Sequence, residues 1–182
     1  TNQAGVCIGV STADCIPGLL YDEEHHAVAA IHAGWRGTLA RIVHKTIQEM
    51  AFTYHTDPKK LKAVIGPGIS LDSFEVGDEV YEAFEQAAFP MEEIAEQRPN
   101  AAFSADPAER ERLAAEGNIV QPLKWHINLP LCNKQILLHC GVAEENIQDC
   151  GICTFLHSDE YFSARKLGTE SGRIYTAILL EK

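Results

Sequence analysis

Long hydrophobic runs are absent from this 182-residue sequence. Its apolar stretches fall far short of the roughly 18 residues that a membrane-spanning helix needs. No charged segment followed by an apolar one opens the chain, so no secretory signal is visible. The sequence also contains no internal repeat and no low-complexity tract. We therefore expect a globular protein of the cytoplasm, with no membrane partner.

Positive charge is also scarce. The sequence has 15 lysines and arginines against 26 aspartates and glutamates, a net charge of −11. No basic cluster offsets this excess, and a negative field repels phosphate backbones. The balance argues against nucleic acid as a partner. One or two local arginines could still hold a small anionic substrate.

The six cysteines are not expected to form disulfides. A chain of this length buries roughly 70% of its surface and needs no covalent staples. Its composition, 46% hydrophobic and 23% charged, is ordinary for a globular protein. Cys150 and Cys153 form a single CxxC, a weak metal or redox signal without a second pair. We interpret them as two reduced cysteines along a buried strand.

Short apolar runs alternate with segments of helical periodicity, which predicts a mixed α+β sheet protein in one domain over residues 1–182. An acidic turn at 22–25 predicts a β-hairpin. Thr38 and Asp78 are expected to cap helices, and Gly141 to end one. The predicted strands are 5–10, 16–21, 26–31, 61–66, 147–155 and 173–180; helical periodicity covers 39–50, 80–88 and 131–139, and an exposed helical excursion covers 90–122.

The densest cluster of reactive side chains lies at the ends of two predicted adjacent strands. Cys15 ends the sequence Thr-Ala-Asp-Cys, and His32 follows 17 positions later. A thiolate and an imidazole can bind zinc, and a third ligand with an open position would activate water. Alternatively, His32 lowers the pKa of Cys15 and the thiolate attacks an electrophile. A buried cysteine beside a core histidine is the third interpretation.

Three segments, which follow one another along the chain, resemble the motifs of a known family. They are STADCIPGLLYDEEHHAVAAIHAGWRGTLARIV, IGPGISLDSFEVGDEV and CTFLHSDEYFSARKLGTESGRIYTAILL. They resemble the conserved core, the GP…EVG segment and the ending of the YfiH-like family, also called the polyphenol-oxidase (laccase) domain family or peptidoglycan editing factor. The segments span residues 11–180, and HAGWRG in particular is specific.

The resemblance implies a fold and a metal site. The fold is an α+β arrangement of mixed sheets between helical layers (α/β/β/α), similar to the catalytic domains of CNF-type deamidating toxins. Cys15 and His32 match two metal ligands, usually of zinc. The family's third ligand is a histidine in an earlier segment that this sequence does not contain, so we expect an N-terminally incomplete domain. The histidines that could substitute are His25, His26, His126 and His157.

The sequence departs from the family at several positions. Asp72 and Ser73 stand where many relatives have two cysteines, so no ligand is expected there. The family's FFSYRR motif keeps its first basic residue as Arg165, after Ala164. Asn128 replaces a common Asp.

The implied activity is that of a zinc-dependent purine nucleoside enzyme. Family members are associated with phosphorolysis of adenosine, inosine, guanosine and methylthioadenosine, and with adenosine deamination. Arg36, Arg165 and Arg173 are the candidates for binding phosphate.

Other roles stay open. The alternatives are copper-dependent polyphenol oxidation, a cysteine hydrolase that edits a peptidoglycan precursor, and a non-catalytic binding module. Trp35 is expected to pack the loop, Glu75 to be a surface carboxylate, and Asp14 either to orient a ligand or to cap a turn. A homodimer is compatible with the sequence, which does not decide it.

Overall fold

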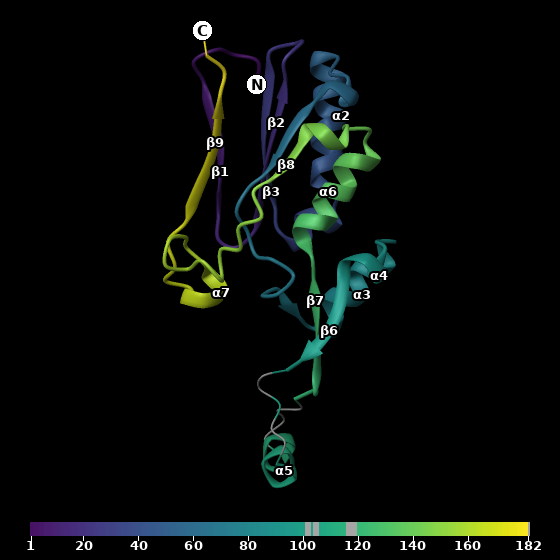
Figure 1. Cartoon of the computed structure of the whole chain (residues 1–182), viewed down its shortest axis with the longest axis vertical. Helices are drawn as coiled ribbons and strands as arrows, with labels where there is room; N and C mark the ends of the chain where they lie inside the picture. Colours follow the sequence, from purple (N-terminus) through teal and green to yellow (C-terminus); the bar gives the residue numbers. More distant parts are fainter. Residues whose placement is uncertain (101–102, 104–105, 116–119, 182) are drawn as a thin grey trace.

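A four-stranded sheet, covered by helices on one face and by a two-stranded ribbon on the other, forms the body of the molecule (Figure 1). The structure is a computed structural model that describes residues 1–100, 103, 106–115 and 120–181. The mixed α+β class is confirmed. None of the helices in these residues is long and apolar enough to cross a bilayer.

The four-stranded sheet has the order β3-β2-β4-β8. Strands β2 (Ile16–Asp22) and β3 (Ala27–Ala33) form the predicted hairpin, and β2 also pairs antiparallel with β4 (Lys62–Ile65). Strand β8 (Ile147–Asp149) is parallel to β4 and shorter than the predicted 147–155. It ends early because the following residues leave β4 and pair with Gly68. The Gly68 N–H donates a hydrogen bond to the Ile152 carbonyl oxygen, and the Gly68 carbonyl oxygen accepts one from the Thr154 N–H.

Two helices pack side by side on one face of this sheet. Helix α2 (Ile42–Tyr54) buries Val43, Ile47 and Met50. Helix α6 (Leu129–His139) is capped by Asn128, whose side-chain oxygen accepts a hydrogen bond from the Leu131 N–H. The Asn that replaces the family's common Asp can therefore fill the same capping role. Gly141 follows this helix with a positive φ of 94°, as predicted for a helix-ending glycine.

The other predicted helix caps are wrong. Thr38 lies inside a short helix, α1 (Trp35–Leu39), whose cap is Gly34. Its buried hydroxyl instead accepts a hydrogen bond from Asn133 Nδ2 at 3.1 Å. Arg41 has left-handed backbone (φ 52°) and separates α1 from α2. Asp78 is the first residue of α3 (Asp78–Gln86), where its charge suits the helix dipole, and Gly77 precedes it as the cap.

The β-ribbon consists of β1 (Cys7–Thr12) paired antiparallel with β9 (Ile174–Leu179). Along both strands, half-buried positions largely alternate with exposed ones, and the two strands contact β3 and β2 of the four-stranded sheet. The opposite face carries exposed Tyr175 and Leu179. Within the described residues the layers are helix, sheet and ribbon, and no helix covers the outer face of the ribbon (Figure 1).

A third sheet, of order β5-β7-β6, extends from the body with α3, α4 (Met91–Ile94) and α5 (Pro107–Ala115). Its strands are β5 (Glu75–Val76), β6 (Ala95–Pro99) and β7 (Leu123–Ile127). The predicted helical excursion over 90–122 is therefore wrong at β6, whose polar residues become a strand because β7 pairs with them. Residues 101–102, 104–105 and 116–119 of that prediction lie outside the described part. The remaining short elements are η1 (Pro58–Lys60), η2 (Glu144–Asn146) and α7 (Ala164–Leu167).

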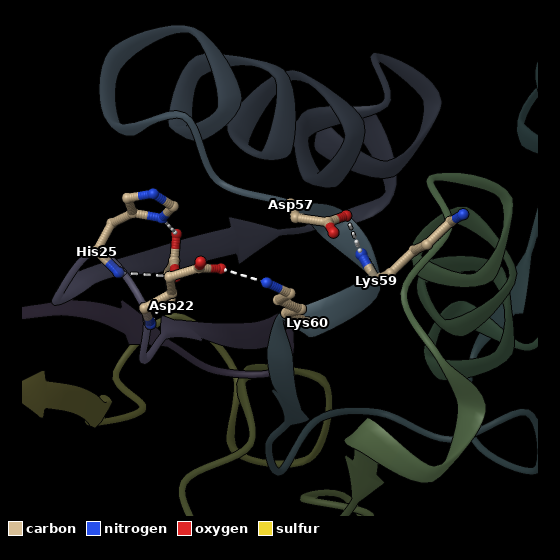
Figure 2. A network of polar contacts seen from close by, with 6 residues as sticks. Asp22, His25, Asp57, Lys59 and Lys60 are labelled. Atoms are coloured by element: carbon tan, nitrogen blue, oxygen red, sulfur yellow. Dashed lines mark hydrogen bonds and ion pairs between the residues drawn. The ribbon is translucent and has the colours of Figure 1, made fainter.

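A polar network closes the β2–β3 hairpin (Figure 2). The carboxylate of Asp22 is buried and accepts hydrogen bonds from the backbone N–H groups of Glu24 and His25, while its second oxygen lies 3.0 Å from His25 Nδ1. Burial opposes ionisation of Asp22, but the Thr56 side chain and the hydrogen bonds from His25 outweigh it, so the pKa of Asp22 lies below its ordinary value. Lys60 of η1 adds an exposed ion pair with Glu24 at 2.7 Å.

We predict that Asp22→Ala lowers the free energy of unfolding by about 1–3 kcal/mol at neutral pH, because it removes the buried carboxylate that accepts the hydrogen bonds of the hairpin turn. Since the folded pKa lies below the unfolded one, this stabilisation is present above about pH 4 and is lost as the pH falls through the folded pKa. Denaturant unfolding at several pH values measures it. Glu24→Gln is the control, with a change of less than about 1 kcal/mol expected. An effect of Asp22→Ala that does not shrink in acid contradicts the account.

Candidate functional site

Cys15 and His32 lie together at one end of the β2–β3 hairpin. Cys15 directly precedes β2, and His32 pairs with Pro17 near the end of β3. Gly34 lies opposite Cys15, beyond the last paired residues. The position that a Cβ on Gly34 would occupy is 2.7 Å from Cys15 Sγ and 4.0 Å from His32 Nε2. Both candidate ligand atoms therefore border the same small space.

The glycine-rich turn after β4 holds the backbone that carries Cys15. The N–H of Ile69 donates to the carbonyl oxygen of Asp14 at 2.9 Å. A Cβ on Gly68 would lie 2.4 Å from Ile16 Cδ1 and 3.1 Å from the Asp14 oxygen, so a larger residue there would force the Ile16 side chain and the Asp14 backbone to shift. The GPG segment therefore supports the site and contributes no reactive group of its own.

Asp14 ties the C-terminal segment to the site. Its buried carboxylate accepts a hydrogen bond from Thr154 Oγ1 at 2.6 Å and another from the Arg165 backbone N–H at 2.8 Å. Between these partners, Ser163 caps α7 by accepting a hydrogen bond from the Lys166 N–H. The expected turn cap is not what the described contacts of Asp14 form: the side chain joins two distant segments.

A hollow of about 400 Å³ opens beside Cys15, a volume within the range of small-molecule sites. Its apolar walls come from four separate parts of the chain, and Asp14, Cys15 and Arg165 supply its polar groups. The apolar lining residues are Trp35, Ile69, Phe74, Leu129 and Ala164. The sequence did not single out Phe74 or Leu129 as site residues, because both also have the pattern of ordinary core residues.

The three candidate arginines lie in different surroundings. Arg165 borders the hollow, and its guanidinium donates to the Glu75 carbonyl oxygen at 2.9 Å. The Arg36 guanidinium stacks on Trp35, 4.1 Å from the ring centroid. Arg173 is exposed and donates to the carbonyl oxygens of its neighbours Ser171 and Gly172. Of the three, only Arg165 lines the described hollow.

The electrostatic surroundings of Cys15 favour its neutral thiol. Burial raises the pKa of Cys15, and the negative charge of Asp14 raises it further, whereas the positive charge of Arg173 lowers it. A bound cation would reverse this balance because it stabilises the thiolate.

Two of the three ligands of the expected metal site lie in the described chain. Among the residues that the structure describes, no three histidine, cysteine or acidic side chains are grouped closely enough to hold a metal ion. His25 contacts Asp22 in the hairpin turn, with His26 beside it, and buried His126 contacts the Leu71 carbonyl oxygen at 2.9 Å. His157 is exposed, in the turn that follows Cys153. None of the four completes a group with Cys15 and His32. The thiol and imidazole nevertheless fit the donor chemistry of zinc.

The CxxC cysteines do not lie along a strand, contrary to the prediction. Cys150 follows the end of β8, and Cys153 is buried beside the glycine-rich turn. The Cys153 sulfur accepts a hydrogen bond from the Ser70 N–H at 3.4 Å and lies 3.6 Å from Ser73 Oγ. Burial alone would raise the pKa of Cys153, but the hydrogen bonds to it outweigh that effect and lower it.

We predict that Gly34→Ala disrupts the space between the two candidate ligands. The backbone at Gly34 (φ −70°) is available to alanine, so the effect is steric: the new Cβ would lie 2.7 Å from Cys15 Sγ. Metal affinity of the full-length protein should fall about 10–100-fold. Gly18→Ala in the same hairpin is the matched control, since its Cβ makes an ordinary 3.5 Å contact with Ile31. Equal affinities for the two variants would contradict this geometry.

The chain is similar to known proteins along its whole length. A family model described as multi-copper polyphenol oxidoreductase laccase matches residues 1–181. A purine nucleoside phosphorylase of Bacteroides thetaiotaomicron is 42% identical over the whole chain, and adenosine deaminase RL5 of an unknown prokaryote is 39% identical over 98% of it. The chain spans about 60% of the length of each of these relatives.

Solved structures share the fold. The crystal structure of protein NMB0706 of Neisseria meningitidis has a TM-score of 0.76 and 30% identity; this chain is covered entirely, and 63% of that one. The hypothetical protein YfiH of Bacillus licheniformis has a TM-score of 0.79 at 23% identity, covering 99% of this chain and 60% of its own.

Proposed function

The chain belongs to the multi-copper polyphenol oxidoreductase laccase family, the YfiH-like proteins, and we propose that it carries the reaction centre of a metal-dependent purine nucleoside enzyme. Its reactions would be phosphorolysis of purine nucleosides and deamination of adenosine. The names of the relatives from Bacteroides thetaiotaomicron and the unknown prokaryote support this class of substrate.

The observation that carries the proposal is the position of Cys15 Sγ and His32 Nε2 around one point beside a hollow. A thiolate and an imidazole are typical zinc ligands, and zinc with an open position supplies an activated water. Cys15 and His32 would hold the metal together with a third ligand outside the described residues. The same donors also accept copper by affinity order.

The hollow beside Cys15 has the composition that a nucleoside requires. The side chains of Trp35, Phe74 and Leu129 line the hollow and offer apolar surface to a purine base. Arg165 borders the same space, and a guanidinium suits a phosphate oxygen pair. We therefore assign phosphate binding first to Arg165. Arg36 stacks on Trp35, and Arg173 influences Cys15 through its charge, so both are secondary candidates.

A cysteine hydrolase is the less favoured function. Its nucleophile would be the Cys15 thiolate, which burial and Asp14 both disfavour when no cation is bound. Polyphenol oxidation is the second candidate, because the matching family model is described by that activity. Metal content of protein prepared without added copper distinguishes it from the zinc-dependent reactions.

Product analysis with adenosine tests the proposal. Full-length, zinc-loaded protein should form adenine and a ribose phosphate only when phosphate is present, or inosine whether or not it is present. The first product set establishes phosphorolysis and the second deamination by activated water. Formation of neither product, with turnover of a phenol by copper-loaded protein, would replace the proposal by the second candidate.

A further inference from the structure

A second hollow, of about 490 Å³, lies between the beginning of α2, the outer side of α6 and the turn that follows α3. It shares none of its described lining residues with the hollow beside Cys15. Phe89 and Ile136 give it apolar surface, and Arg41, His44 and His139 give it polar groups. We call it the Arg41 pocket. Its volume is within the range of small-molecule sites.

Arg41 is held in place with most of its hydrogen-bonding capacity unused. Its Nη2 donates to the Ala87 carbonyl oxygen at 3.0 Å, and its guanidinium carbon lies 4.5 Å from the centroid of the Phe89 ring. These two contacts orient the guanidinium plane. No carboxylate in the described part of the chain forms an ion pair with Arg41. A guanidinium has five N–H donors, so the others are available to a ligand.

The groups around Arg41 also favour an anion. No carboxylate is among the described lining residues, although the whole chain has a net charge of −11. Glu93 is bound to the Gln135 amide at 2.5 Å and does not line the pocket. His44 lies three residues after Arg41, on the same side of α2, and both histidines offer ring N–H donors. The beginning of the 13-residue α2 adds the positive end of a helix dipole.

We propose that the Arg41 pocket binds a small organic acid, with its carboxylate or phosphate group against Arg41 and its apolar body against Phe89 and Ile136. A bidentate oxyanion matches the fixed guanidinium, and the ring and aliphatic side chains bury the rest of the ligand. This inference is independent of the purine nucleoside reaction, because it uses none of the residues around Cys15.

Calorimetric titration of the full-length protein with phenyl phosphate, benzoate and inorganic phosphate tests the inference. Phenyl phosphate or benzoate should bind saturably, at least about fivefold more tightly than inorganic phosphate, since only they bury an apolar group. The more tightly bound of the two identifies the acid group. If neither binds saturably, or if inorganic phosphate binds as tightly as both, the proposal is wrong.

Two matched pairs of variants locate the binding. Arg41→Met should weaken it about tenfold or more, whereas Lys45→Met, which removes the same charge from α2 outside the pocket, should leave it unchanged within about twofold. Because Arg41 also joins α1 to α2, a second pair uses exposed residues of α6: His139→Glu should weaken binding, and Leu138→Glu should not. Equal effects within a pair whose variants are folded would contradict the assignment.

Discussion

Replacing Cys15 by serine is expected to lower purine nucleoside turnover of the full-length protein about 10³-fold or more, the largest effect on activity predicted for this chain. Serine keeps the size of the side chain but replaces a soft sulfur ligand by a weakly acidic hydroxyl that zinc binds poorly. His32 alone would then remain of the two candidate ligands in this chain. Product formation from adenosine, with and without phosphate, measures the loss.

The matched control for this variant is Cys140→Ser. Cys140 is a partly buried free thiol at the end of α6 and is not part of the hollow beside Cys15. Its replacement should leave turnover within about threefold of the original. Both variants should have the same unfolding midpoint within a few degrees. If Cys15→Ser retains turnover comparable to Cys140→Ser, Cys15 is not part of the reaction centre.

Asp14→Ala is expected to have the largest effect on stability among the site variants, a loss of about 3 kcal/mol or more in the free energy of unfolding. The substitution leaves the buried Thr154 hydroxyl and the Arg165 N–H without their acceptor. The segment that carries Arg165 would lose its attachment to the Cys15 loop, so turnover should fall as well. Denaturant unfolding and KM for phosphate measure the two consequences.

Two further variants separate the bonds of Asp14. Asp14→Asn can keep both bonds, because its amide oxygen can accept from the Arg165 N–H while its amide N–H donates to the Thr154 hydroxyl, so it should cost less than Asp14→Ala in both stability and KM for phosphate. Thr154→Val removes only the bond to Thr154 and should cost about 1–3 kcal/mol with a smaller change in KM than Asp14→Ala. If Asp14→Ala leaves both stability and KM unchanged, the carboxylate does not hold the C-terminal segment.

The sequence predicted the hairpin that positions the site because its information is local. Apolar residues over 16–21 and 26–31 flank an acidic turn, and the antiparallel register then brings the ends of the two strands together. The proximity of Cys15 and His32 follows from that register. The helix that follows was misplaced at its beginning, because Thr38 has the pattern of a cap but is bonded by Asn133, 95 residues away.

Interactions between distant segments account for most of what the sequence did not show. Strand β6 has no apolar alternation, and only its pairing with β7 makes it a strand. Asp14 meets Thr154 and Arg165 across 140 and 151 residues, respectively. No local pattern predicts such pairs, although all three residues lie in segments that carry the family resemblance. Phe74 and Leu129 were missed for a similar reason: a wall of a binding site and a core residue have the same periodicity.

The most direct test of the Cys15–His32 centre is the alkylation rate of Cys15 with and without zinc, followed by mass spectrometry of its peptide. Exposed Cys7 is an internal control in the same sample. We predict that zinc slows alkylation of Cys15 about tenfold or more, leaves Cys7 unchanged, and no longer protects Cys15 in the His32→Ala variant. Alkylation of Cys15 at the same rate with and without zinc, or protection that persists without His32, would contradict the metal centre proposed here.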